Sequence, residues 1–268
     1  MKKILIGALL LTGCALPVMA CTGISATAKD GGYVQARTIE WGDSYLPSQY
    51  VVIPCGHEMI SYTPKGMNGA KFRARYGVVG LSIVLKDFVV EGLNEAGLSA
   101  GLFYFPHYGN YPAYDAKQNT RTVADLQLVA WMLSQFSTIE EIKAAMQDIR
   151  VVSVDTTGAS STVHWRIGDA NGRQVVLEFV DGVPCFYENE IGVLTNSPGF
   201  PWQMTNLNNY VNLYPGGAEA HQLGGVTVFP FGAGSGFQGI PGDVTPPSRF
   251  VRAAFYKATA PQCATAYD

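Results

Sequence analysis

The sequence has few charged residues and no cluster of one sign. Of its 268 residues, 15% are charged, the formal net charge is -3, and no run of Lys or Arg is longer than two residues. A nucleic-acid-binding protein presents a clustered basic face, so we expect no nucleic-acid partner. Hydrophobic residues make up 47% of the chain, which excludes a disordered protein and is enough for a full core.

The chain also lacks the residue spacings that bind metals. It contains four His and five Cys, and none of them forms a CxxC or HxxxH pattern. We therefore predict no metal site and no cofactor. The cysteines are too widely spaced to indicate a disulfide framework, and we expect Cys55, Cys185 and Cys263 to be small buried residues.

A long apolar run occurs once, at the start of the chain. Met1-Lys2-Lys3 precedes an apolar stretch over residues 4–11, and Val18-Met19-Ala20 ends the segment. This pattern is typical of a secretory signal peptide and is too short for a membrane span. We predict a signal peptide over residues 1–20, a mature domain over residues 21–268, no membrane span, and export, with the periplasm as the compartment.

An alternative processing site lies within the same leader. Leu11-Thr12-Gly13-Cys14 resembles the lipobox at which a lipoprotein signal peptidase cuts, and Val18-Met19-Ala20-Cys21 is a poorer version. Cys14 could equally be a small apolar residue of the leader. A lipid-anchored form through Cys14 therefore remains an open alternative.

The rest of the chain alternates between strand and helix patterns. Strands are expected at 22–28 and 33–37, joined by Asp30-Gly31-Gly32, and at 49–54, 77–84 and 98–105. One helix is predicted over 123–136 with Thr122 as its cap, and a second from Ser137 with Glu140 as its capping-box partner. Strands at 162–167, 175–179, 184–187 and 191–195 follow. This order predicts an α+β fold.

Cleavage after Ala20 would make Cys21 the new N-terminus. A thiolate is the nucleophilic form of cysteine, and a terminal cysteine carries its own base, because its α-amine has a reference pKa of about 7.7–8.0. That amine could take the thiol proton and return it to a leaving amine. The role requires a free amine, and the simpler reading of Cys21 is an ordinary mature terminus.

Five motifs stand in order along the chain. They are Cys21-Thr22-Gly23, Ala36-Arg37, Glu91-Gly92-Leu93-Asn94-Glu95-Ala96-Gly97-Leu98, Ile191-Gly192-Val193-Leu194-Thr195-Asn196-Ser197-Pro198, and the segment from Gly239 to Phe250. Together they resemble the motifs of the choloylglycine hydrolase family, which comprises bile salt hydrolases and penicillin V acylases. The resemblance runs from Cys21 to about Phe255. It implies a four-layer αββα sandwich of the N-terminal-nucleophile hydrolase type, hydrolysis of a linear amide with Cys21 as nucleophile, and a homo-oligomer, often a tetramer.

The resemblance also implies roles for three further residues. Arg37 would favour the thiolate electrostatically, although it could also form a surface salt bridge. Asn196 would donate to the oxyanion, or could simply shape the turn before Ser197-Pro198. Arg249 would orient the catalytic cluster.

Three features depart from the bile salt hydrolase pattern. Glu40 stands where the family usually has an aspartate that supports the nucleophile. Tyr104 falls at a position where tyrosine is a penicillin V acylase feature. The sequence ends at Asp268, whereas the family's chains usually continue, so either the sequence is a fragment or the C-terminal strands are absent. If they are absent, we expect a sheet edge to be exposed.

The leading functional hypothesis is hydrolysis of glycine- or taurine-conjugated bile acids. Its small-molecule substrate would lie against aromatic residues of loops 60–69 and 105–114, namely Tyr62, Phe105, Tyr108 and Tyr111, which could also be ordinary loop packing. The second hypothesis is a penicillin V acylase or an N-acyl homoserine lactone acylase. The third is a truncated, non-catalytic bile-acid-binding lipoprotein.

Overall fold

The first hairpin of the domain forms where the sequence predicts it. The computed structural model describes residues 19–41, 45–154 and 162–268; the leader up to residue 18, including Cys14, lies outside them. β1 (Met19–Thr27) pairs antiparallel with β2 (Tyr33–Trp41), and Gly31 takes a positive φ of 88° in the turn. The short strand β14 (Val193–Leu194) pairs with the other edge of β1, which gives a three-stranded sheet in the order β14-β1-β2.

A second, larger sheet contains seven antiparallel strands. Its order is β13-β12-β11-β8-β7-β6-β3. The strands are β3 (Ser48–Ile53), β6 (Val78–Ile83), β7 (Val89–Asn94), β8 (Ser99–Tyr104), β11 (Val163–Gly168), β12 (Gln174–Val180) and β13 (Val183–Glu188). The sequence analysis found each of these except β7.

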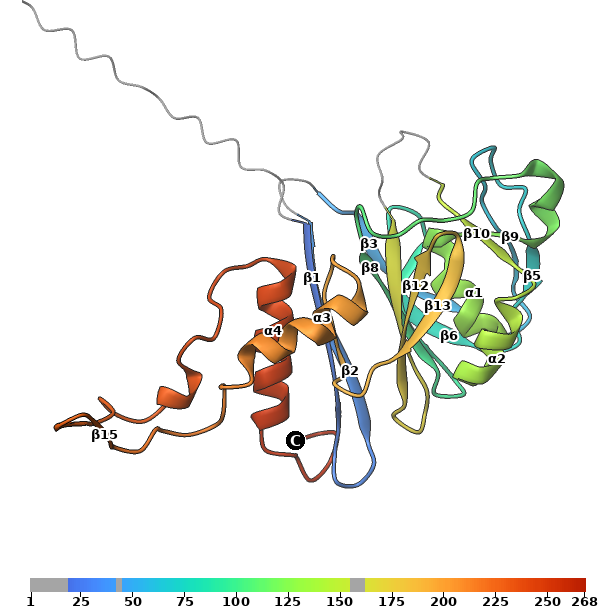
Figure 1. Ribbon diagram of the computed structural model, residues 1–268. Helices are drawn as coiled ribbons and strands as arrows, with labels where there is room; N and C mark the ends of the chain where they lie inside the picture. Colours follow the sequence, from blue (N-terminus) through green and yellow to red (C-terminus); the bar gives the residue numbers. More distant parts are fainter. Residues whose placement is uncertain (1–18, 42–44, 155–161) are drawn as a thin grey trace, which may run out of the picture.

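Helices cover the outer faces of both sheets. α1 (Leu128–Gln135) and α2 (Ile139–Ala145) lie on the large sheet, and α3 (Phe200–Asn206) and α4 (Pro246–Thr259) lie on the small one (Figure 1). The result is the expected α+β sandwich of four layers, αββα. Among the described residues β2 pairs only with β1, so its other edge is open.

Smaller elements complete the fold. They are the strand pairs β4 (Glu58–Ile60) with β5 (Lys71–Arg73), β9 (Thr122–Ala124) with β10 (Arg150–Val152), and β15 (His221–Leu223) with β16 (Val226–Val228), and the 3₁₀ turns η1 (Ala116–Arg121), η2 (Asp125–Gln127), η3 (Leu207–Tyr210) and η4 (Ser235–Phe237). The β15–β16 pair lies on an arm that extends away from the four layers (Figure 1).

The predicted start of the first helix is wrong. Thr122 does not cap a helix but begins β9, which pairs in parallel with β10. The strand is further held because the Ala124 N–H donates to Ser61 Oγ, at 2.8 Å. Val123 is fully buried, and a β-branched residue suits a strand, so α1 begins only at Leu128.

The capping box of the second helix is displaced by one residue. Thr138, not Ser137, is the cap: its side chain accepts from the Glu141 N–H, and the Glu141 carboxylate accepts from the Thr138 N–H. Glu141 Oε2 also accepts from the Ser137 N–H at 2.7 Å. The sequence contains the capping-box pattern twice, as Ser137 with Glu140 and as Thr138 with Glu141, so the pattern alone does not distinguish the two caps.

The three cysteines expected to be buried are not. Cys55 and Cys263 are exposed and Cys185 is half-buried, whereas Cys21 is buried. All four are free thiols among the described residues. Cys55 lies in the turn after β3 and Cys263 in the tail after α4, where there is too little surrounding structure to cover them.

Gly23 allows the two sheets to approach each other closely. A Cβ placed on Gly23 would lie 2.6 Å from the Phe103 ring on β8 and 2.9 Å from Arg166 Nη1 on β11. Any larger residue would therefore push β1 away from the large sheet. This close approach places the start of β1 over β8, which is where the site lies.

Candidate active site

Cys21 points into the space between the two sheets. Strand alternation buries Cys21, Gly23 and Ser25 on one face of β1 and leaves Ile24 and Ala26 exposed on the other. The thiol therefore faces the large sheet and is only 6% exposed. The main chain on both sides of the thiol is fixed by β-pairing, with Ala20 opposite Glu40 and Cys21 opposite Ile39.

A cavity of about 600 Å³ opens in front of this thiol. Cys21, Arg37, Tyr104, Asp125 and Ser153 contribute its polar lining. Its walls are otherwise mostly apolar and come from Ile39, Leu46, Pro47, Ile83, Val84, Val90, Leu102, Leu126, Val154 and Val163. A cavity of this size can enclose a drug-sized apolar molecule.

Asn196 lies directly beside the nitrogen of Cys21. Its Oδ1 accepts from the Cys21 N–H at 2.8 Å, and its Nδ2 donates to the Tyr104 carbonyl at 2.7 Å. Because two N–H donors meet Oδ1 and a carbonyl meets Nδ2, the orientation of the amide follows from its partners. One Nδ2 hydrogen serves Tyr104, and the other is available to a further acceptor.

Arg249 connects three parts of the site from α4. Its Nη2 donates to Asn196 Oδ1 at 2.8 Å, and its Nη1 donates to the Cys21 carbonyl and to Thr22 Oγ1. Burial lowers the pKa of Arg249, while the charges of Glu40 and Cys21 act in the opposite direction. Arg249 thus fixes the main chain of Cys21 and the side chain of Asn196 together.

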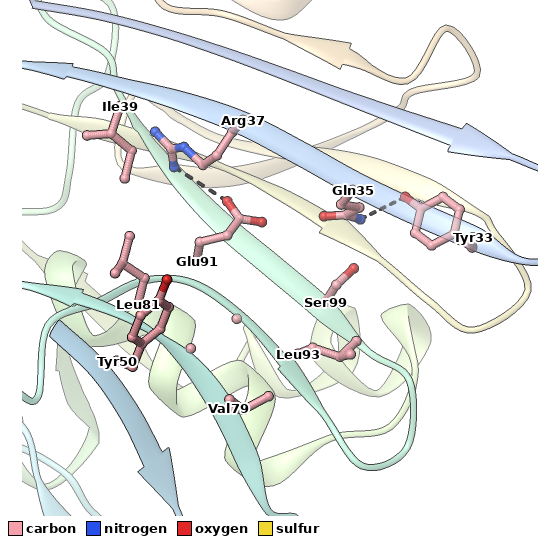
Figure 2. Close-up of a pocket in the computed structure, with 12 residues that line it drawn as sticks. Tyr33, Gln35, Arg37, Ile39, Tyr50, Val79, Leu81, Glu91, Leu93 and Ser99 are labelled. Carbon is pink, nitrogen blue, oxygen red and sulfur yellow. Dashed lines mark hydrogen bonds and ion pairs between the residues drawn. The ribbon is translucent and has the colours of Figure 1, made fainter. Parts of the chain in front are cut away.

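Arg37 lines the same cavity as Cys21 and is held between the sheets. Its guanidinium lies 4.0 Å from the centre of the Phe103 ring, and its Nη1 donates to the Leu102 carbonyl. Figure 2 shows Arg37 of β2 and Glu91 of β7 pointing toward each other, with Nη1 3.5 Å from Glu91 Oε2. The Arg37 side chain is therefore a buried cation, 7% exposed, that pairs with the half-buried Glu91 between the sheets, and it is not part of a surface salt bridge.

Glu91 also pairs with a second buried arginine. Arg166 Nη2 lies 2.8 Å from Glu91 Oε1, and its Nη1 donates to the Ile24 carbonyl of β1 at 2.9 Å. The Arg166 side chain is fully buried. One carboxylate thus faces two guanidinium groups in the space between the sheets, which explains how both charges are accommodated.

A second cavity, of about 570 Å³, also adjoins Arg37. Figure 2 shows its lining from β2, β7 and the outer strands of the large sheet, including Tyr33, Gln35, Tyr50 and Glu91. It lies next to the open edge of β2, where the large sheet continues beyond the small one. Cys21 is not among the residues that line it.

The structure separates Glu40 from the thiol. Glu40 is exposed and alternates with Ile39 and Arg37 along β2, so it lies on the opposite face of that strand from the cavity. Its charge acts on Arg249, whose pKa it raises. Glu40 would therefore influence the Cys21 site only indirectly, through its charge interaction with Arg249.

Of the five predicted aromatic site residues, only Tyr104 lines the cavity. Tyr62 packs against Phe88, and Phe105 stacks on His164 with Tyr108 beside it. Tyr111 donates from its hydroxyl to the Val163 carbonyl and packs in the core under α1. These four residues support loops, and the cavity wall is formed instead mainly by aliphatic side chains, with Tyr45 and Tyr104 as its aromatic members.

Sequence reasoning missed Glu91, Arg166 and Asp125. Glu91 lies in a motif that carried the family resemblance, which was a usable signal. Arg166 and Asp125 carry no local signal, because each is defined by what packs around it. Burial raises the pKa of Asp125 to about 7, against hydrogen bonds from the Leu126 and Val154 N–H groups that lower it.

Residues 19–41, 45–154 and 162–268 contain neither a cluster of metal ligands nor a membrane-spanning helix. No group of three or more His, Cys, Asp or Glu side chains there could hold a metal ion. No helix in this part of the chain has the length and apolar character needed to cross a membrane.

Comparison with known proteins defines first the class and then the family. The conjugated bile acid hydrolase of Clostridium perfringens, solved as a mutant, matches with a TM-score of 0.78 and 31% identity over 89% of this chain and 72% of that one. The penicillin V acylase of Agrobacterium tumefaciens matches with a TM-score of 0.71 and 25% identity over 90% and 66%. The fold is thus that of the N-terminal-nucleophile hydrolases.

The sequence comparison is more specific. Residues 21–267 match the family described as linear amide C–N hydrolases, choloylglycine hydrolase family. A curated relative, the bile salt hydrolase/transferase of Clostridium perfringens, is 32% identical over 241 residues, which are 88% of this chain and 71% of the relative. The chain belongs to the choloylglycine hydrolase family, and it is a hydrolase that acts on carbon–nitrogen bonds in linear amides.

Proposed function

We propose that this protein hydrolyses the amide bond of glycine- or taurine-conjugated bile acids, with Cys21 as the nucleophile. The observation that carries the proposal is the position of the buried Cys21 thiol at an apolar cavity of about 600 Å³ that Arg37 also lines, while Asn196 and Arg249 hydrogen-bond to the main chain of Cys21. A sterol is apolar and of suitable size for such a cavity. The bile salt hydrolases among the relatives support this substrate class.

The chemistry requires removal of residues 1–20. In the full chain the Cys21 nitrogen is a peptide N–H; cleavage after Ala20 converts it into an amine that already has Asn196 Oδ1 as a partner at 2.8 Å. The amine accepts the thiol proton, and the thiolate attacks the amide carbon of the substrate. Arg37 brings a positive charge to the same cavity.

Asn196 then stabilises the charge that develops on the carbonyl oxygen. Its second Nδ2 hydrogen is the donor proposed for this oxyanion. The C–N bond breaks, the departing glycine or taurine amine takes the proton from the Cys21 ammonium, and a thioester to Cys21 remains. Water attacks the thioester, releases the bile acid and restores the thiol.

Penicillin V is the second candidate substrate, because Tyr104 lines the cavity and a penicillin V acylase shares the fold.

The exported protein should be purified and incubated with glycocholate, taurocholate, penicillin V and an N-acyl homoserine lactone. We expect release of glycine or taurine from the bile acids. Faster hydrolysis of penicillin V or of the lactone would replace the bile-acid assignment, and no hydrolysis of any of them would overturn the enzyme mechanism.

Processing and localisation are part of the same proposal. We expect the mature protein to begin at Cys21 with a free amine and to be found in the periplasm. Intact-mass measurement of the exported protein tests this, because an acyl lipid on Cys14 or Cys21 would add its mass and favour the lipoprotein alternative. A lipid on Cys21 would leave no amine to act as base.

We also propose that the protein forms a homo-oligomer, as the family resemblance implies. Exposed apolar residues on the arm support this, among them Val226, Phe229 and Phe231, since apolar patches of this kind commonly form interfaces. Light scattering after size-exclusion chromatography should give a mass above that of one chain. A mass equal to one chain would contradict the proposal.

A further inference from the structure

A buried imidazole and carboxylate lie between the two sheets, close to the candidate site but outside its cavity. His164 of β11 is fully buried and Glu178 of β12 is 2% exposed. His164 Nδ1 lies 2.9 Å from Glu178 Oε1. The ring of Phe105 stacks on the imidazole at 4.2 Å with an interplanar angle of 6°, which fixes the plane of the ring.

The other nitrogen of this imidazole reaches the loop that carries Asn196. His164 Nε2 lies 3.0 Å from the Thr195 carbonyl oxygen. A carbonyl oxygen can only accept, so Nε2 must carry a hydrogen and donate it. Thr195 follows the end of β14 and has no β-ladder partner, so the imidazole supplies the hydrogen bond that a neighbouring strand would otherwise provide.

Glu178 holds the same loop at its far end. Its Oε1 accepts from the Phe200 N–H at 2.8 Å as well as from His164 Nδ1. Phe200 begins α3. The imidazole–carboxylate pair therefore anchors both ends of the segment from Thr195 to Phe200, and Asn196 is the second residue of that segment.

The pair holds two protons between its members. Nε2 needs one to donate to Thr195, and a second must lie between Nδ1 and Glu178 Oε1, since both of those atoms otherwise present lone pairs. Oε1 already accepts from Phe200. A glutamine at position 178 cannot fully replace this arrangement. Its oxygen could accept from both Phe200 and Nδ1 only if the imidazole remained a buried cation without a carboxylate partner, and its amide N–H could donate to a neutral Nδ1 only if the bond from Phe200 were lost.

We propose that His164, oriented by Glu178 and Phe105, is a positioning residue for Asn196. It acts by fixing the Thr195 carbonyl, so that the Asn196 amide keeps its place between the Cys21 nitrogen and the Tyr104 carbonyl. The inference rests on the proposed function, in which Asn196 stabilises the oxyanion. It predicts that the pair affects the chemical step more than the binding of substrate.

The test compares three substitutions at position 164 in the exported, processed protein. His164→Phe removes both hydrogen bonds but keeps an aromatic ring for Phe105. His164→Gln can place its Nε2 hydrogen near Thr195, whereas the shorter His164→Asn can reach only toward Glu178. A matched control is Trp165→Phe, because Trp165 is equally buried on β11 but faces the opposite, α1-covered side of the sheet.

Steady-state kinetics are measured with whichever of glycocholate or penicillin V the wild type hydrolyses, and circular dichroism confirms folding. We expect kcat of His164→Phe to fall by about 10- to 100-fold, as for displaced catalytic geometry, with KM changed less than about threefold. His164→Gln should recover part of kcat, and His164→Asn should not. Glu178→Gln should behave like His164→Asn.

Each other outcome overturns the inference in a recognisable way. A kcat for His164→Phe equal to that of Trp165→Phe, or a higher kcat for His164→Asn than for His164→Gln, would remove the proposed role of the Thr195 contact while leaving the proposed function intact. If His164→Phe does not fold, the comparison of the glutamine and asparagine variants still decides. A wild type that hydrolyses none of the substrates would instead overturn the proposed function, and this inference with it.

Discussion

The two sheets of the molecule are built from different kinds of residue. On β11 of the large sheet, Val163, Trp165 and Ile167 face the helices α1 and α2 and are buried in the main hydrophobic core. On β1 of the small sheet, the buried residues are the small or polar Cys21, Gly23 and Ser25. Most of the apolar burial therefore lies with the large sheet, and the reactive group lies on the small one.

The contrast continues across the faces of the large sheet. The residues of β11 that face the small sheet are His164 and Arg166, both fully buried. A polar group buried in this way must be hydrogen-bonded, and these two bond across the gap to Thr195 and to Ile24. The space between the sheets is therefore a polar layer that fixes the small sheet's position, whereas the space under α1 and α2 is an apolar core.

The substitution with the largest expected effect on activity is Cys21→Ser, at the reactive group of the small sheet. Because a serine hydroxyl is a far weaker nucleophile than a thiol at neutral pH, we expect amide hydrolysis to fall by about 10³-fold or more. The unfolding midpoint in urea should stay close to that of the wild type. Cys55→Ser, at an exposed thiol, is the matched control and should retain full activity. Substantial turnover by Cys21→Ser would exclude the thiol as the nucleophile.

Asn196→Ala should have the next largest effect. Removal of one oxyanion donor lowers kcat by about 10²–10³-fold, and we expect KM to change far less. Asn196→Asp keeps an oxygen for the Cys21 nitrogen and Arg249 but loses the donor, so it should be similarly impaired. A rise in KM with an unchanged kcat would show that Asn196 binds substrate and does not stabilise the transition state.

Much of the fold could be predicted from the sequence, because strands with alternating or continuous apolar residues are local patterns. The hairpin of β1 and β2 is an example, since Asp30-Gly31-Gly32 specifies its turn. The start of α1 could not be predicted, because Val123 is drawn into β9 by its pairing with β10. α4 was missed although Thr245-Pro246-Pro247 is a typical helix start, and its Phe250, Val251 and Ala254 form the buried stripe.

The candidate site shows the same division. Arg37, Asn196 and Arg249 were identified through motifs, and the structure places them around Cys21 or its cavity. The cavity wall was not predictable, because Leu46, Val84 and Leu102 are ordinary aliphatic residues until the fold brings them together. The aromatic content of two loops predicts Tyr62 and Tyr111 as substrate-binding residues, but in the structure they support loops, a role for which aromatic residues are equally suited.

The polar layer between the sheets can be tested through stability. Glu91→Gln would leave Arg37 and Arg166 without a carboxylate in a buried position, and we expect a loss of about 2 kcal/mol in the free energy of unfolding. Glu140→Gln is the control, since Glu140 pairs with Arg173 and Lys143 at the surface of the molecule, where such pairs contribute little. Urea unfolding measures both. Equal effects of the two substitutions would contradict the distinction between the polar layer and the surface.

A further test concerns Asp125, whose carboxyl group lines the cavity. Burial raises the pKa of Asp125 to about 7, so between pH 4 and pH 7 the folded protein keeps a proton that the unfolded chain has lost. The free energy of unfolding must then fall as pH rises through this range, by up to about 1.4 kcal/mol per pH unit.

In Asp125→Asn the side-chain oxygen can still accept from the Leu126 and Val154 N–H groups, but this titration is absent. The stability of Asp125→Asn relative to wild type should therefore increase from pH 4 to pH 7 and level off above it, as measured by urea unfolding at a series of pH values. A difference that does not depend on pH would show that Asp125 is solvated like a surface carboxylate, and that the burial of charge is confined to the layer between the sheets.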